Sequence, residues 1–168
     1  MTRIVNQLLD MAKLDQMVET REETDLVAVC QDIVAALAPE AIKSGRSIGL
    51  SLPEGMTSCR VLAREQDVWH MVRNLVENAI RHTGPGTQID VMVEADGTLI
   101  VADDGPGIPQ EMQPHIFKRF WRAKRSGGSG AGLGMAIVQR VAQANGGTIE
   151  LASREGEGTR FTIRLPRA

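Results

Sequence analysis

Three clusters of polar or glycine residues hold the side chains that could do chemistry. They read NLVENAIRHT from 74 to 83, DDGPGIP from 103 to 109 and GAGLGMAIV from 130 to 138. Amide oxygens suit Mg²⁺, a carboxylate accepts hydrogen bonds from an amine, and a glycine loop exposes backbone N–H groups to phosphates. Each cluster alone has an ordinary explanation as a helix face or turn, but their conjunction predicts a nucleotide site.

The first cluster lies on a helix predicted over 65–82. Its apolar residues recur at helical spacing and form one core face: Val68, Met71, Val72, Leu75, Val76 and Ala79. A second stripe at spacings of three and four holds Asn74, Glu77, Asn78 and Arg81. An ordinary solvated face is the alternative, but asparagine forms helices poorly, so two on one stripe favour a ligand.

The second cluster begins where an apolar strand ends. Asp103 could accept a hydrogen bond from the exocyclic amine of adenine, while Gly105 and Gly107 would let the backbone lie close to the base. Asp104 is expected to be exposed. A simple Asp-Gly turn between two elements would explain the same residues.

The third cluster opens onto a helix predicted over 133–144. Gly130, Gly132 and Gly134 would leave backbone N–H groups free at its positive end, where phosphates bind. No lysine follows as in a P-loop, and the spacing is not that of a dinucleotide fold. A flexible linker running into a helix is the alternative.

The composition restricts what the chain can be. Its 168 residues suit one domain with a short appendage, and 19 Lys and Arg against 21 Asp and Glu give no basic field for nucleic acid. Cys30 and Cys59 lack metal-ligand spacing and are expected to be free thiols in a reducing compartment. No apolar run approaches about 18 residues, so this piece is expected to be soluble.

The remaining pattern predicts mixed α and β structure. Apolar spacing indicates an amphipathic helix over 1–18, followed by a polar linker over 19–25. Thr24 is predicted to cap a helix that Pro39 kinks or splits and Gly45 ends. The other expected elements are strands at 47–52 and 60–63, a hairpin of 87–94 with 98–102, a short helix over 110–117 and a closing hairpin of 148–153 with 159–165.

In this order the clusters resemble the N, G1 and G2 boxes of the sensor histidine kinase catalytic domain. IFKRFWRAKR at 116–125 is similar to its F box, and NGGTIELASREGEGTRFTIRLP at 145–166 to its closing hairpin. The resemblance implies an α+β Bergerat fold, a two-layer sandwich of a mixed, mainly antiparallel sheet with helices on one face, after a short N-terminal helix. Residues 1–20 resemble the end of the second dimerisation helix with its linker, and 21–168 the ATP-binding domain.

The resemblance also implies roles for residues. Asn78 would hold Mg²⁺, Asn74 and Arg81 would reach the ATP phosphates, Asp103 would bind adenine, and Glu77 would act as a base or orient a metal-bound water. The other nucleotide-binding positions that it implies are His82, Gly105, Gly107, Ile108, Phe117, Arg122, Arg125, Gly130, Gly132, Leu133, Gly134 and Thr159.

The activity implied is transfer of the ATP γ-phosphoryl group to a histidine on a dimerisation helix, expected upstream of this chain. His70, His82 and His115 lie in the ATP domain and do not substitute for it. The expected partners are that helix and a response regulator. The whole protein is expected to be a homodimer anchored in a bacterial inner membrane with this domain cytoplasmic. An ATPase of the same superfamily, or a nucleotide-binding module without transfer activity, is the alternative.

Overall fold

The computed structural model describes residues 5, 8, 9, 12, 22–121 and 132–168, and the rest of the helix predicted over 1–18 lies outside them. The four isolated positions are helical and exposed. The elements that follow are β1 (Glu23–Asp25), α2 (Leu26–Lys43), β2 (Ser47–Ser51), β3 (Arg60–Leu62), α3 (Glu65–His82), β4 (Gln88–Val93), β5 (Thr98–Asp103), η1 (Gln113–His115), α4 (Gly134–Ala144), β6 (Thr148–Arg154) and β7 (Gly158–Arg164).

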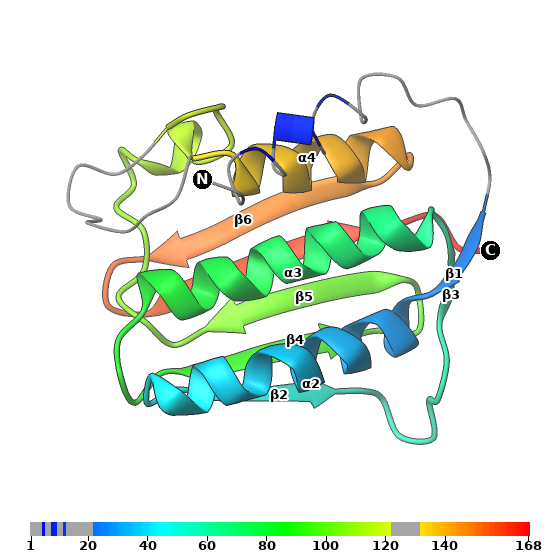
Figure 1. The fold of residues 1–168 in the computed structure, drawn as a ribbon, viewed down its shortest axis with the longest axis horizontal. Coiled ribbons are helices and arrows are strands. Elements are labelled where there is room, and N and C mark those ends of the chain that lie inside the picture. The colour runs from blue at the N-terminus through cyan, green and yellow to red at the C-terminus, as the bar shows by residue number, and fades with distance from the viewer. Residues whose placement is uncertain (1–4, 6–7, 10–11, 13–21, 122–131) are drawn as a thin grey trace.

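The main sheet has the strand order β2-β4-β5-β7-β6. Its β2–β4 pair is parallel and the other three pairs are antiparallel. Figure 1 shows α2, α3 and α4 side by side across one face of this sheet. The predicted α+β, two-layer fold with a mainly antiparallel sheet is therefore confirmed, as are both predicted hairpins.

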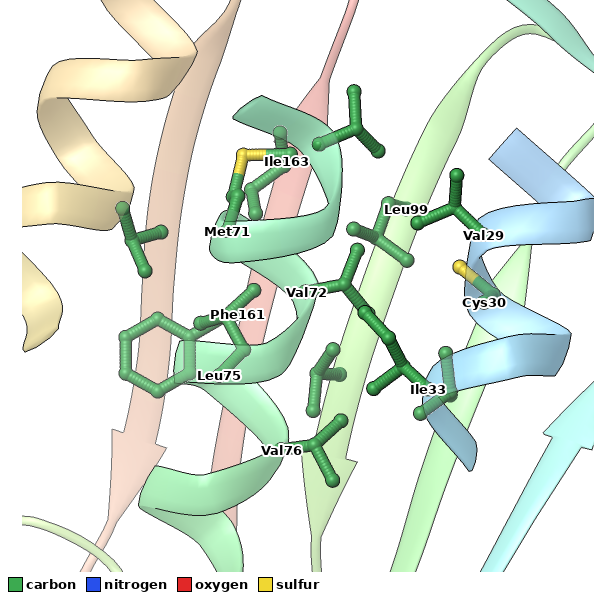
Figure 2. Packing of buried hydrophobic residues seen from close by; sticks show 14 of the residues in the cluster. Val29, Cys30, Ile33, Met71, Val72, Leu75, Val76, Leu99, Phe161 and Ile163 are labelled. Carbon is green, nitrogen blue, oxygen red and sulfur yellow. The ribbon is translucent and has the colours of Figure 1, made fainter. Parts of the chain in front are cut away.

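The core lies between α3 and the sheet. All six residues of the predicted apolar face of α3 are buried. Figure 2 shows Met71 and Leu75 over Phe161 and Ile163 of β7, while Val72 is directed towards α2. Because packing uses this face completely, the polar stripe of α3 is left to face outwards.

The start of α2 differs from the prediction. Asp25 is the N-cap, and its Oδ1 accepts hydrogen bonds from the N–H groups of Val27 at 3.1 Å and Cys59 at 3.0 Å. Thr24 is instead buried and donates its hydroxyl to the Ala63 carbonyl at 2.6 Å. The linker predicted over 19–25 is wrong at its end, because residues 23–25 pair with β3. A three-residue strand held by tertiary pairing leaves no local pattern.

Two further expectations need correction. Helix α2 runs through Pro39 without being split. Pro39 and Ala35, whose carbonyl loses its helical donor, are both exposed, so water can satisfy that carbonyl. The short helix predicted over 110–117 is only the single 3₁₀ turn η1, because Pro109 and Pro114 leave little room for regular helix.

The ends of the elements gather the three clusters. Helices α2 and α3 run in the same direction and α4 runs against them, so the C-terminal end of α3 lies near the N-terminal end of α4 (Figure 1). The end of β5 and the β6–β7 turn reach the same end of the molecule. At the opposite end Asn145 joins the two helices, since its Oδ1 accepts from Arg64 N–H at 3.2 Å and its Nδ2 donates to Val141 O at 2.9 Å.

Candidate functional site

The first and third clusters contact each other. A Cβ added at Gly134, the first residue of α4, would lie 3.1 Å from Asn74 Oδ1 on α3. The amide of Asn74 donates to the His70 carbonyl at 2.7 Å, which fixes the orientation of the side chain. Leu133 at the N-cap of α4 provides no side-chain cap, so the first N–H groups of the helix are available to a ligand.

Asp103 lies at the end of β5, half-buried, opposite Thr159 of β7. Its Oδ1 accepts a hydrogen bond from Gly105 N–H at 2.9 Å. Burial raises the pKa of Asp103 above its ordinary value and the charge of Asp104 adds to this, although N–H groups of Gly105 and Thr159 act in the opposite sense. A carboxylate desolvated in this way gains from a ligand that donates a hydrogen bond to it.

Two glycines of the second cluster lie where no side chain fits. A Cβ at Gly105 would be 2.5 Å from Thr83 Cγ2 and 2.8 Å from Asp103 Oδ1. Gly107 has a φ of +72° and its Cβ would meet the Arg154 carbonyl oxygen. This turn is therefore built for close approach of backbone, beyond what an ordinary Asp-Gly turn requires.

Ser153 joins the second cluster to the closing hairpin. Its hydroxyl accepts from Ile108 N–H at 2.8 Å and lies 2.9 Å from the Thr159 hydroxyl. Ile108 and Thr159, which are 51 positions apart in sequence, are thereby brought to the same end of the sheet as Asp103.

The polar stripe of α3 has unequal environments. Glu77 forms an ion pair with Arg73 at 2.8 Å, and Asn78 is half-buried with no side-chain hydrogen bond to any described residue. Arg81 and His82 end the helix on its exposed side. Desolvation by neighbouring groups, with the positive charge of Arg81, lowers the pKa of His82 and favours its neutral form.

Residues flanking the glycine loop form a backbone pair. Phe120 N–H donates to the Gly132 carbonyl at 3.0 Å, and Gly132 has a φ of +71° with its Cβ direction 2.6 Å from the Trp121 carbonyl. Phe117 packs edge-on against Phe161, and Leu133 is fully buried, so their side chains belong to the core. Arg122, Arg125 and Gly130 lie outside the described residues.

Three residues of this region were not singled out from the sequence: Arg46, Thr83 and Ser153. They lie outside any motif spacing, and only the folded chain brings them to the clusters. A separate cavity of about 590 Å³ lies at the opposite, N-terminal end of α3, lined by Glu22, Arg64, Glu65, Gln66, Trp69 and His70. None of the predicted site residues lines it.

A family model described as histidine kinase-, DNA gyrase B-, and HSP90-like ATPase matches residues 63–168. The chain belongs to this family. Membership makes a nucleotide the expected ligand of the glycine-lined end of the sheet, and the matched range contains all three clusters. In the described part of the chain, no helix is long and apolar enough to cross a membrane.

Relatives of this ATPase chain are sensor kinases. The sensor histidine kinase RppB of Synechocystis sp. is 32% identical over 174 residues, 99% of this chain and 38% of RppB. The sensor protein kinase PmrB of Pseudomonas aeruginosa is 36% identical over 173 residues, 98% of this chain and 35% of PmrB. The solved structure of the mycobacterial sensor histidine kinase MprB matches with a TM-score of 0.74 at 26% identity, over 88% of this chain and 98% of that one.

The chain thus spans little more than a third of the length of the curated relatives named here. Its fold and its relatives are those of the catalytic, ATP-binding domain of two-component sensor histidine kinases. They do not favour the alternative of a superfamily ATPase or of a binding module without phosphotransfer activity.

Proposed function

We propose that this domain binds ATP at the end of the sheet where the three clusters meet, and transfers the γ-phosphoryl group to a histidine. The observation that carries the proposal is the half-buried carboxylate of Asp103, held by Gly105 N–H beside glycines that admit no side chain. Such a group is suited to accept the exocyclic amine of adenine.

The phosphates would lie between α3 and the start of α4. Asn74 contacts Gly134, so one ligand could reach this amide and the uncapped N–H groups of α4 together. Arg81 projects from the end of the same stripe and would neutralise phosphate charge. Arg122, Arg125 and the loop at Gly130 belong to the proposal by resemblance alone.

The residues present fit a Mg²⁺ ion carried with the nucleotide. Asn78 offers an amide oxygen that no described residue uses, one turn beyond Asn74. Among the described residues, no group of three His, Cys, Asp or Glu could hold a metal. Mg²⁺ is commonly held by one or two protein ligands and substrate phosphates, and when bound it neutralises charge that develops on the transferred group.

Phosphoryl transfer depends mainly on positioning and charge. Glu77, oriented by Arg73, would act as a base or hold a water beside the phosphates. The acceptor would be a histidine on a dimerisation helix of the same or a partner subunit, and the phosphohistidine would serve a response regulator. The whole kinase would be a homodimer with this domain on the cytoplasmic side of a bacterial inner membrane.

The proposal is tested in two stages. Calorimetry with ATP, with and without Mg²⁺, measures binding to the domain itself. The domain is then mixed with a dimerisation helix that carries the acceptor histidine and with radiolabelled ATP, and acid-labile label on histidine is the expected product. Saturated ATP binding without any labelled histidine would leave only a nucleotide-binding module.

A further inference from the structure

We propose that Thr83 forms one wall of the adenine recess and that Arg46 is the positioning residue that holds it there. This inference rests on the proposed ATP site. It adds a nucleotide contact from the C-cap of α3 and a supporting residue from the loop after α2, a segment that contributes none of the residues assigned above.

The position of the Thr83 methyl group follows from Gly105. One point, the site of a Cβ at Gly105, lies 2.5 Å from Thr83 Cγ2 and 2.8 Å from Asp103 Oδ1. The methyl group and the carboxylate therefore flank the same glycine. A base whose amine reaches Asp103 over this glycine would contact the methyl group of Thr83.

The hydroxyl of Thr83 is held away from this recess. It donates to the Ala79 carbonyl at 2.7 Å and accepts from Arg46 Nε at 3.0 Å. A threonine side chain has few χ1 wells, so fixing the hydroxyl also fixes the methyl group. The contacts thus turn the apolar side of Thr83 towards Asp103, where it adds to the desolvation of the carboxylate.

Arg46 joins two loops through a single guanidinium. Besides Thr83 Oγ1, it donates to the Thr83 carbonyl through Nη2 and to the Ser44 carbonyl through Nη1 at 3.0 Å. The backbone supports the same junction, since Gly86 N–H donates to Gly45 O at 2.8 Å and Ser47 N–H to Thr87 O at 3.0 Å. Figure 1 shows the C-terminal ends of α2 and α3 at the same end of the molecule.

The experiment uses substitutions that separate the two roles. Thr83→Ser keeps the hydroxyl but removes the methyl wall, Thr83→Val keeps the methyl volume but removes the hydroxyl, and Arg46→Ala removes the support. Arg164→Ala is the matched control, because Arg164 is also a sheet-edge arginine in one ion pair, with Glu150 at 2.8 Å.

Calorimetry should show ATP binding weakened about fivefold by Arg46→Ala, the loss expected for one net hydrogen bond. Thr83→Ser should weaken binding about threefold without a change in melting temperature, as expected for part of a buried methyl contact. Binding stoichiometry should stay at wild-type value in both, and Arg164→Ala should bind like wild type. Because Arg46 acts through the Thr83 hydroxyl, Arg46→Ala combined with Thr83→Val should cost less than the product of the two single effects.

Three outcomes would overturn the inference. They are wild-type affinity in Arg46→Ala, wild-type affinity in Thr83→Ser, and strictly multiplicative effects in the double variant. A fall in stoichiometry with unchanged affinity would also overturn it, because it would show that Arg46 only keeps molecules folded. Failure of wild-type protein to bind ATP is a different result and would defeat the proposed function itself.

Discussion

At the residue scale, Asp103 is subject to two opposed requirements. It must be ionised to accept the amine of a base, yet its burial beside β7 raises its pKa and disfavours that form. A group whose pKa is raised on folding contributes stability below its unfolded pKa and loses it as pH rises through the folded pKa. At neutral pH the carboxylate therefore destabilises the unliganded domain, and a bound adenine would relieve this.

Asp103→Asn tests this compromise. An amide can still accept from Gly105 N–H but carries no charge to desolvate, so the unliganded variant should melt at or above the wild-type temperature. ATP binding should weaken by about 1.5 to 3 kcal/mol, the value of a hydrogen bond to a charged group. Calorimetry and thermal melts check both signs, with Asp32→Asn on the exposed face of α2 as control. Unaltered ATP affinity would remove Asp103 from the base site.

The pH dependence of ATP binding follows from the same shift. Wild-type affinity should fall as pH is lowered through the raised pKa, beginning above the ordinary aspartate range. Protonation of the nucleotide phosphates also contributes in this range, so the informative quantity is the difference between wild type and Asp103→Asn. That difference should vanish at low pH, and a constant difference from pH 4 to pH 8 would contradict the assignment.

Glu77→Gln separates catalysis from binding. The amide keeps the shape of the side chain and a hydrogen bond to Arg73, but it cannot accept a proton. We expect the transfer rate to fall roughly 100-fold, as for loss of a general base, with ATP affinity within about twofold of wild type. Arg73→Gln is the partner control, because it frees Glu77 without removing it. Equal transfer rates in Glu77→Gln and wild type would limit Glu77 to helix stabilisation.

Sequence reasoning was most informative where a residue type is chemically costly. Asparagines within a helix and an aspartate at the end of an apolar strand need an explanation, so Asn74 and Asp103 are apparent from the sequence. Arg46 and Thr83 are ordinary loop and helix-end residues. Their roles depend on the packing of two loops that are 37 positions apart, which no local pattern encodes.

At the element scale, periodicity predicted what local spacing determines. The bounds 65–82 for α3, its buried face and both hairpins follow from apolar spacing and turn residues. The short strands β1 and β3 depend on each other, and Thr24 was taken as a cap because threonine and aspartate both suit that position. Only the tertiary partner of each decides between them.

The N-cap of α2 yields a stability prediction. Burial acts to raise the pKa of Asp25, but hydrogen bonds from Cys59, Ser58 and Val27 outweigh it and hold the pKa below its ordinary value of 3.8. The contribution to stability is therefore present above the unfolded pKa and lost as pH falls through the folded pKa. Asp25→Ala should lower the free energy of unfolding by about 1 to 2 kcal/mol at pH 7.

Urea unfolding at pH 7 and at pH 3 measures this effect. The gap between wild type and Asp25→Ala should narrow at the lower pH, whereas Asp25→Asn, which retains an acceptor, should lose less at pH 7. A gap of the same size at both pH values would show that the charge of Asp25 does not contribute to the cap.

At the scale of the whole molecule, ligand binding and core stability are linked. Cys30 is fully buried on α2, and Figure 2 shows it facing the packed side of that helix. Burial raises the pKa of its thiol to about 12, with smaller contributions from Cys59 and Asp25. The reactive thiolate is therefore almost absent in the folded state, and Cys30 reports opening of the domain.

Labelling of Cys30 by a thiol reagent, resolved from Cys59 by mass spectrometry, should follow the population of opened molecules. ATP binds the folded state alone, so ATP at 100 times its Kd should lower that population by about 100-fold, which corresponds to about 2.7 kcal/mol. The same ATP concentration should protect Asp103→Asn much less, because it saturates that variant poorly. Equal protection of both proteins would show that ATP stabilises the fold without using Asp103, and labelling unaffected by ATP in wild type would show that α2 opens independently of the nucleotide site.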